Sequence, residues 1–306
     1  MSEAVAKKWL GEGVIEKLSR LEFVARGTVE GFVAGKHRSA RKGASVEFAE
    51  HRQYVPGDDL RNLDWKLMAR RQRFYVKQYV DETNLRATIA LDCSGSMTYC
   101  GQAAFDSLSK FDYGRHLAAA LAYLLVSQQD AAGFVAFDSA VRTYMPAKAS
   151  PAQVGNILDA IDTIKPGGET EIAAVLHEIA ERIPRRSVVF VISDFFADAS
   201  ALIKAFHHLR FRHHEVIAIR TVAAEESTFP FGQHSRFEDL ESALMFDVDA
   251  RALRNDYLEH YRRHEAELKR ACGEMRIAFE TAQTSVPFDQ ALADMLIGYH
   301  QRGGRR

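Results

Sequence analysis

The sequence has few cysteines and no long apolar run, and these two shortages narrow the class of protein. Its 306 residues include three cysteines, Cys93, Cys100 and Cys272, which are too few and too scattered for a disulfide framework and favour a reducing compartment. The longest apolar stretches, residues 117–126 and 188–193, are far shorter than the ~20 residues that a membrane helix needs. The N-terminus also lacks the apolar block of a secretory signal. We therefore expect a cytoplasmic protein with no stable membrane insertion.

An excess of charge of one sign is also missing. The 40 Lys and Arg residues nearly balance the 41 Asp and Glu residues, and hydrophobic residues make up 47% of the chain, which is typical of a globular protein. Basic residues outnumber acidic ones in residues 1–80, but the two kinds are interspersed and no nucleic-acid-binding motif accompanies them. We therefore expect no nucleic acid among the partners.

Apolar strands alternate with helices from residue 86 onward. Strands are expected at residues 87–91, 133–137, 141–145, 188–193, 215–220 and 275–281, and helices at residues 112–129, 151–161, 171–183, 199–210, 251–272 and 289–299. Runs such as VVFVIS are apolar at almost every position, as a sheet covered on both faces requires. The pattern predicts an α/β fold with a doubly wound, mainly parallel sheet over residues 85–302. A helical and β extension, residues 1–84, precedes this domain, and residues 303–306 form a tail.

Oxygen-bearing side chains gather at the ends of two predicted strands. The first strand runs into the pattern Asp-x-Ser-x-Ser, in which Asp92, Ser94 and Ser96 are the polar positions. Asp194 follows a second strand, and Thr170 stands directly before a helix. Ligands of doubly wound sheets bind at the carboxyl ends of the strands, near the point where strand order reverses. We therefore expect these side chains to meet at one edge of the sheet.

Two carboxylates and three hydroxyls make a set of hard oxygen ligands, which suits Mg²⁺ or Mn²⁺ rather than zinc. With so few carboxylates the cation would keep residual positive charge and one coordination position for water or an incoming acid. We therefore predict a metal site whose shell an acidic residue of a partner protein completes. Taken singly, Asp-x-Ser-x-Ser could be a turn and Thr170 a helix N-cap, so the prediction depends on all the pieces together.

The segments TIALDCSGSM, GGETEIAAVL and VVFVISDFF resemble the metal-ion-dependent adhesion site of von Willebrand factor A domains. The resemblance covers roughly residues 85–302 and implies a sheet with strand order 3-2-1-4-5-6. It also implies direct metal ligation by Ser94, Ser96 and Thr170, with the two aspartates often acting through water. The neighbouring residues that we expect to contact a partner are Gly95, Met97, Gly168, Glu169 and Phe195.

A second resemblance concerns the segment EFAEHRQYVPGDDLRNLDWKLMARRQRFYVKQY, which lies before that domain. It is similar to the signature of the bacterial family called domain of unknown function 58. Relatives often have Ser or Thr in place of Met68, and the loop at residues 97–110 is longer here than is usual. The family implies partnership with a MoxR-type AAA+ ATPase in the maturation or remodelling of other proteins, a chaperone-like role.

A catalytic role is the main alternative. Asp92 after a strand is also a feature of phosphoester hydrolases with the pattern Asp-x-Asp-x-Thr, but Ser94 stands where their second acid transfers a proton. The sequence contains no P-loop, so ATP hydrolysis would come from another protein. We therefore predict a non-enzymatic adaptor and keep a metal-dependent phosphoester hydrolase as the alternative.

Overall fold

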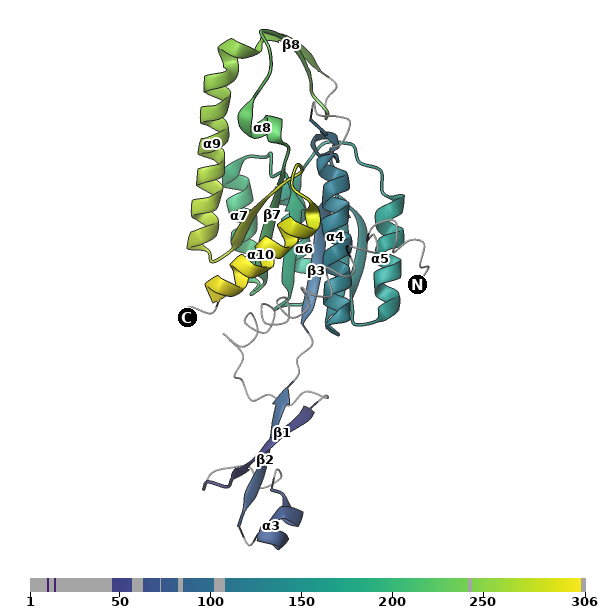
Figure 1. Cartoon of the computed structure of the whole chain (residues 1–306), viewed down its shortest axis with the longest axis vertical. Helices are drawn as coiled ribbons and strands as arrows, with labels where there is room; N and C mark the ends of the chain where they lie inside the picture. Colours follow the sequence, from purple (N-terminus) through teal and green to yellow (C-terminus); the bar gives the residue numbers. More distant parts are fainter. Residues whose placement is uncertain are drawn as a thin grey trace. The chain divides into compact units, whose positions relative to one another are not determined.

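The computed structural model describes residues 10, 14, 46–56, 63–71, 73–81, 85–101, 108–241 and 244–303 (Figure 1). These residues fall into two compact units. Residues 46–81 belong to one unit, and residues 10, 14 and 85–303 belong to the other. The four-residue tail predicted at 303–306 lies outside the described residues apart from Gly303.

The smaller unit contains an antiparallel pair of strands, β1 (Val46–Gln53) and β2 (Tyr75–Asp81), and a short helix, α3 (Trp65–Arg71). The Asp64 carboxylate accepts a hydrogen bond from the Leu67 backbone N–H at 3.0 Å and so caps the first turn of α3.

The larger unit is built on a six-stranded sheet. Its strands are β3 (Arg86–Asp92), β4 (Ala131–Phe137), β5 (Val141–Lys148), β6 (Val188–Ser193), β7 (Glu215–Val222) and β10 (Ala278–Gln283). They lie in the order β10-β7-β6-β3-β4-β5, and every pair is parallel except β4 with β5. Strand order therefore reverses between β3 and β6, which are neighbours in the middle of the sheet.

Helices cover both faces of this sheet. One face carries α4 (Lys110–Ser127), α5 (Pro151–Thr163) and α10 (Phe288–Gly303), and the other carries α6 (Ile172–Arg182), α7 (Ala199–Phe211) and α9 (Ala250–Glu274) (Figure 1). Successive residues of a strand point to opposite faces, so Ile89 packs in the first core and Ala90 in the second. The predicted α/β, doubly wound and mainly parallel fold is confirmed.

Residues 224–249 hold elements that the sequence analysis did not predict. They form a short helix, α8 (Ala224–Thr228), and an antiparallel hairpin of β8 (His234–Glu238) and β9 (Met245–Asp249), which leads directly into α9 (Figure 1). Every residue of the two strands is exposed or half-buried, so they lack the apolar pattern of the central strands. Within the described parts of the chain, no helix has the length and apolar content needed to cross a membrane.

Candidate metal centre

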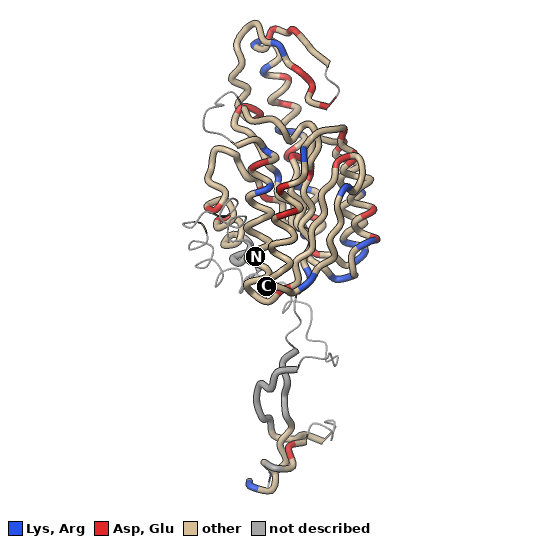
Figure 2. Tube along the Cα trace, turned by 90° about the vertical axis from the view of Figure 1, so that its right-hand side faces the viewer, with Lys and Arg blue, Asp and Glu red and all other residues tan. Residues whose placement is uncertain are grey.

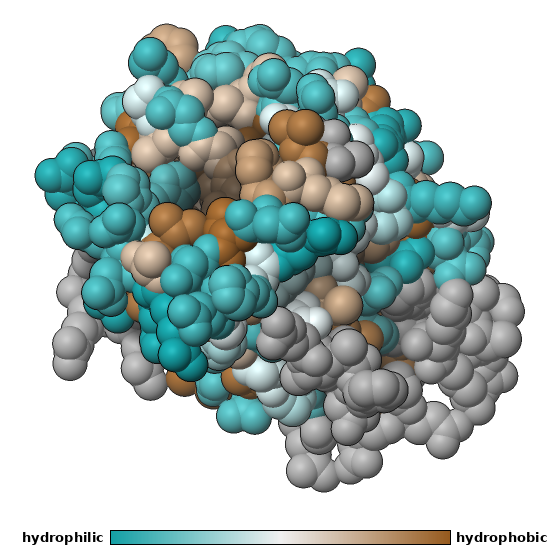
Figure 3. All heavy atoms as spheres, turned by 90° about the horizontal axis from the view of Figure 1, so that it is seen from above, coloured by the Kyte–Doolittle hydropathy of each residue, from teal (hydrophilic) through white to brown (hydrophobic). Residues whose placement is uncertain are grey.

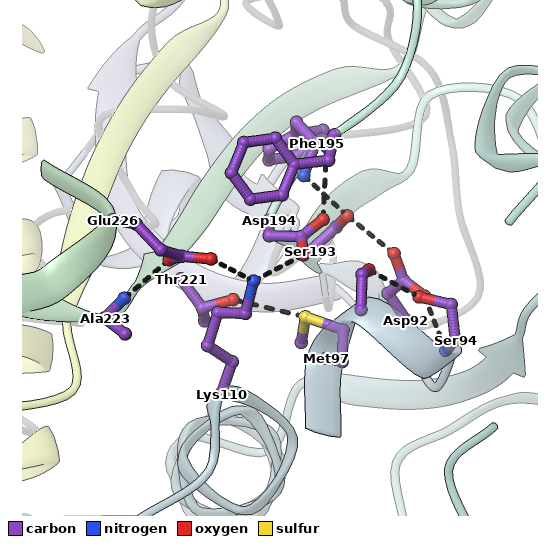
Figure 4. Close-up of polar contacts among 12 residues, drawn as sticks. Asp92, Ser94, Met97, Lys110, Ser193, Asp194, Phe195, Thr221, Ala223 and Glu226 are labelled. Carbon is purple, nitrogen blue, oxygen red and sulfur yellow. Dashed lines mark hydrogen bonds and ion pairs between the residues drawn. The ribbon is translucent and has the colours of Figure 1, made fainter. Parts of the chain in front are cut away.

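The two predicted carboxylates lie at the ends of adjacent strands. Asp92 ends β3 and Asp194 follows β6, and both are buried, with exposed fractions of 0% and 1%. One oxygen of Asp92 accepts the Ser94 backbone N–H at 2.9 Å, and the other accepts the Ser193 hydroxyl at 2.7 Å (Figure 4). The strands therefore hold two acids side by side, with Asp92 fixed in orientation at both of its oxygens.

This arrangement makes ionisation of the Asp92 carboxyl unfavourable. Burial, and then the negative charge of Asp194, raise the pKa of the Asp92 carboxyl from 3.8 to about 7, although the hydrogen bonds from Ser193 and Ser94 favour the ionised form. A cation placed between the two carboxylates would relieve this repulsion.

The three hydroxyls are the oxygens left available. The Ser94 and Ser96 hydroxyls, on either side of Gly95 at the start of a 3-10 turn (Gly95–Thr98), lie 3.2 Å apart. The Thr170 hydroxyl oxygen is buried and has no hydrogen-bond partner among the described residues. A buried hydroxyl without a partner is costly, and a metal ion would satisfy it.

Backbone hydrogen bonds tie the loop of Thr170 to the loop that follows β3. The Gly95 N–H donates to the Gly168 carbonyl at 2.8 Å, and the Gly167 N–H donates to the Cys93 carbonyl at 2.9 Å. Gly167 and Gly168 have φ of 144° and 92°, values that a side chain would oppose. The glycines before Thr170 therefore let the two predicted ligand loops lie against each other.

Arg142 supports the same loop and was not predicted. Its guanidinium donates to the Gly167 carbonyl at 2.7 Å and to the Lys165 carbonyl at 2.9 Å, and it forms an ion pair with Asp138. Arg142 lies on β5, so the edge strand of the sheet positions the loop that carries Thr170.

Lys110 is the main residue of the centre that the sequence analysis missed. Its ammonium is 1% exposed and donates to Asp194 Oδ2 at 2.7 Å and to Glu226 Oε1 at 2.6 Å (Figure 4). Burial opposes its charge, but the two carboxylates outweigh burial and raise the pKa of Lys110. Because Lys110 engages one oxygen of Asp194, this aspartate is better suited to reach a cation through its other oxygen or through water.

The residues present fit a hard divalent cation. Among the described residues there is no group of three or more His, Cys, Asp and Glu side chains that could hold a metal, and the candidate set instead combines two carboxylates with three hydroxyls. Ser94, Ser96 and Thr170 could bind the ion directly, with Asp92 and Asp194 in support, and such a set is typical of Mg²⁺ or Mn²⁺ sites.

Two of the residues expected to contact a partner lie in the core instead. Met97 is 0% exposed and its sulfur accepts the Thr221 hydroxyl at 3.4 Å. Phe195 is also 0% exposed and packs against two other phenylalanines. Neither side chain can meet a partner, because the loops turn inward at these positions. The next residue, Phe196, is 41% exposed and offers the surface that was expected of Phe195.

The other three lie closer to the surface or to the hairpin. Gly168 and Glu169 are exposed, so contact with a partner stays a prediction for both. Gly95 is buried under the β8–β9 connection, where an added Cβ would lie 2.4 Å from the Leu240 carbonyl oxygen. Beside it, the Thr170 N–H donates to the Glu241 carboxylate at 3.4 Å. The chain therefore places an acid of its own next to a candidate ligand.

A comparison with known families places the chain. The family described as "Protein of unknown function DUF58" matches residues 50–267, which is more than half of the chain. The chain belongs to the DUF58 family. Proteins similar to this chain include uncharacterized proteins of Mycobacterium bovis and Mycobacterium tuberculosis, each 27% identical over 272 residues, covering 86% of this chain and 84% of theirs.

Solved structures resemble this DUF58 chain more distantly. BatB from Bacteroides thetaiotaomicron is 17% identical, with a TM-score of 0.44, and the match covers 71% of this chain and all of that one. The von Willebrand factor A domain of SpRpn10 is 12% identical, with a TM-score of 0.38 and coverages of 68% and 94%. The strand order of the sheet is the 3-2-1-4-5-6 order that the first resemblance implied. The predicted assignment to the DUF58 family is confirmed.

Proposed function

We propose that this protein is a non-enzymatic, metal-dependent adaptor that binds other proteins. Ser94, Ser96 and Thr170 hold Mg²⁺ or Mn²⁺ directly, Asp92 and Asp194 support it, and an acidic residue of a partner fills the remaining position. The observation that carries the proposal is the Thr170 hydroxyl, which is buried, lies in a loop tied to the Asp92–Ser96 segment and has no described hydrogen-bond partner.

The partner in this proposal is a MoxR-type AAA+ ATPase, a client protein of that ATPase, or both. Membership of the DUF58 family supports this partner class, because the sequence signature before the domain resembles that of proteins paired with such ATPases. The adaptor would act in the cytoplasm, where it would help the ATPase to mature or remodel its clients.

The contacts of the two aspartates support binding rather than phosphoester hydrolysis. Asp92 is fully buried and both of its oxygens already accept hydrogen bonds, so it is poorly placed to attack a substrate. One oxygen of Asp194 is held by the Lys110 ammonium. These contacts suit a binding role, which needs no attacking aspartate and only a free coordination position for a partner's carboxylate.

Magnesium calorimetry on matched variants tests the metal site. Thr170→Val keeps the shape of the side chain and removes a hydroxyl that makes no hydrogen bond, so it should fold normally and lose magnesium binding. Thr163→Val is the control, because the Thr163 hydroxyl is exposed and donates only to a carbonyl at the end of α5. Magnesium uptake that is equal in the wild type and in Thr170→Val would overturn the assignment of this ligand.

Capture of a purified MoxR-type ATPase from the same genome tests the partner. We expect wild type and Thr163→Val to retain the ATPase in magnesium and to lose it in chelator, while Thr170→Val fails in both. Retention of the ATPase that neither chelator nor Thr170→Val reduces would contradict a metal-dependent adaptor. Magnesium-dependent turnover of a generic phosphoester that Asp92→Ala abolishes would favour the hydrolase instead.

A further inference from the structure

A large cavity opens directly beside the candidate metal centre. Its volume is about 1190 Å³, and its wall includes Ser96, a candidate ligand, and Lys110. The wall also includes residues of α8, of the β8–β9 hairpin and of the first turns of α9. Figure 3 views this end of the molecule and shows apolar side chains gathered around a hollow on it. A ligand in the cavity would therefore lie next to whatever binds at the metal.

Aromatic rings form much of the wall. Phe229 lies at the centre of a cluster, with ring centroids 4.5 Å from Tyr257, 4.9 Å from Phe231 and 5.8 Å from Phe237. Phe196 joins the wall from the loop after β6 and stacks under the Lys110 ammonium at 4.8 Å. Such rings pack against apolar chains and attract cations over their faces.

The charges of the cavity are mainly negative. Its wall carries five acids, at positions 226, 238, 239, 241 and 256, and Figure 2 shows acidic positions along the hairpin and the start of α9. Its two permanently basic side chains are already engaged. Lys110 pairs with Asp194 and Glu226, and Arg236 donates to Asp247 at 2.9 Å.

Two of these acids have no such partner. Among the residues that the structure describes, no ion pair engages Glu238 or Asp256, and both are exposed and line the cavity. An aromatic wall with exposed carboxylates complements a long cationic side chain, whose methylenes pack on the rings while its charge reaches the acids.

We propose that this cavity binds a lysine or arginine side chain of the partner protein. The inference rests on the proposed function for the identity of the partner, and it adds a second element to what that partner must present. Because Ser96 belongs to both sites, the basic residue would stand close to the acid that completes the metal shell. The partner segment would therefore carry an acidic and a basic residue near each other.

Binding of N-acetyl-arginine amide, followed by NMR, tests the cavity alone. This probe has no carboxylate, so it does not need the metal, and the measurement is made in chelator. Its neutral isostere, N-acetyl-citrulline amide, should bind about fivefold more weakly or worse, because it loses the charge contacts. The difference should vanish in the double variant Glu238→Gln/Asp256→Asn. It should persist in Asp159→Asn, which changes an exposed acid on α5.

Each result decides the matter independently of the metal site. Equal affinities for the two probes would overturn the proposal, and so would tighter binding of N-acetyl-leucine amide. NMR shifts confined to residues outside the cavity would overturn it as well. Arginine binding that persists in Thr170→Val would support the cavity. It would do so even if that variant and wild type took up magnesium equally, a result that removes Thr170 from the proposed metal ligands.

The link to the metal is tested with peptides in which aspartate and arginine are joined by one to three glycines. At least one spacing should bind about tenfold more tightly in magnesium than in chelator, since two linked contacts act together. The matched peptide with citrulline should lose most of that gain. If magnesium binds to the protein but raises the affinity of none of these peptides, the acid and the base do not act in one partner segment. The proposed link between the cavity and the metal is then overturned.

Discussion

Replacing Asp92 by asparagine should stabilise the metal-free protein at high pH. The pKa of Asp92 in the folded protein, about 7, is above the ordinary value of 3.8, so its ionisation opposes folding as pH rises between these values. Asparagine removes that charge and keeps both contacts, because its oxygen accepts the Ser94 N–H and its nitrogen can donate to the Ser193 hydroxyl.

The magnitude follows from the shift in pKa. Between about pH 5 and about pH 8 the difference in unfolding free energy between Asp92→Asn and wild type should change by about 2–3 kcal/mol in favour of the variant, at about 1.4 kcal/mol per unit. For a domain of this size that is roughly 5–10 °C in melting temperature. Burial comes before Asp194 among the causes, so the effect should survive in high salt.

Thermal or urea unfolding in chelator at several pH values measures this difference, with Asp159→Asn as the control. Added magnesium should then stabilise wild type at pH 8 and leave Asp92→Asn unchanged, because the variant lacks one of the two carboxylates that support the ion. A difference in unfolding free energy that does not change with pH would refute the argument that folding raises the pKa of Asp92.

Three further changes test other contacts of the centre. Lys110→Met should lower the unfolding free energy by about 3–5 kcal/mol in chelator, since two carboxylates lose a buried ammonium, and magnesium should restore more stability than it gives wild type. Glu241→Gln should raise the affinity of the magnesium-loaded site for free acetate about threefold in a calorimetric titration, because an internal acid beside Thr170 is removed. Gly95→Ala should cost about 1–3 kcal/mol in urea unfolding, as its Cβ would meet the Leu240 carbonyl, whereas Gly232→Ala, with nothing within 4 Å, should cost far less.

The central sheet could be predicted because burial on both faces leaves a clear pattern. The strand β6 (Val188–Ser193) was predicted to the residue, and each of its positions is buried. The ends of helices and strands were harder to predict. The strand expected at 275–281 begins later, at Ala278, because Met275 still caps α9. The hairpin of β8 and β9 was missed because it borders a cavity and packs against no continuous core, so it has no apolar alternation.

The supporting residues of the candidate metal centre could not be predicted for a different reason. Lys110 and Asp194 are 84 residues apart, and Glu241 and Thr170 are 71 apart, so nothing local indicates that they meet. The Cys93 thiol, between the candidate ligands Asp92 and Ser94 in the sequence, is buried and donates to the Phe137 carbonyl at 2.9 Å. Motif spacing therefore identified the candidate ligands, while their charge partners depend on the folded arrangement.

The charges of the centre also explain why a partner with both an acid and a base is suitable. Asp92, Asp194 and Glu226 bring three negative charges and Lys110 brings one positive charge, so these four groups carry a net charge of −2 when all are ionised. The neighbouring Arg220 lies 3.9 Å from Glu265, and this pair adds no net charge. A divalent cation brings this buried cluster to neutrality. A partner carboxylate bound alone would leave one excess negative charge there, which a poorly solvated site opposes. A lysine or arginine delivered into the adjacent cavity by the same segment compensates that charge, so the two proposed contacts are electrostatically favourable together.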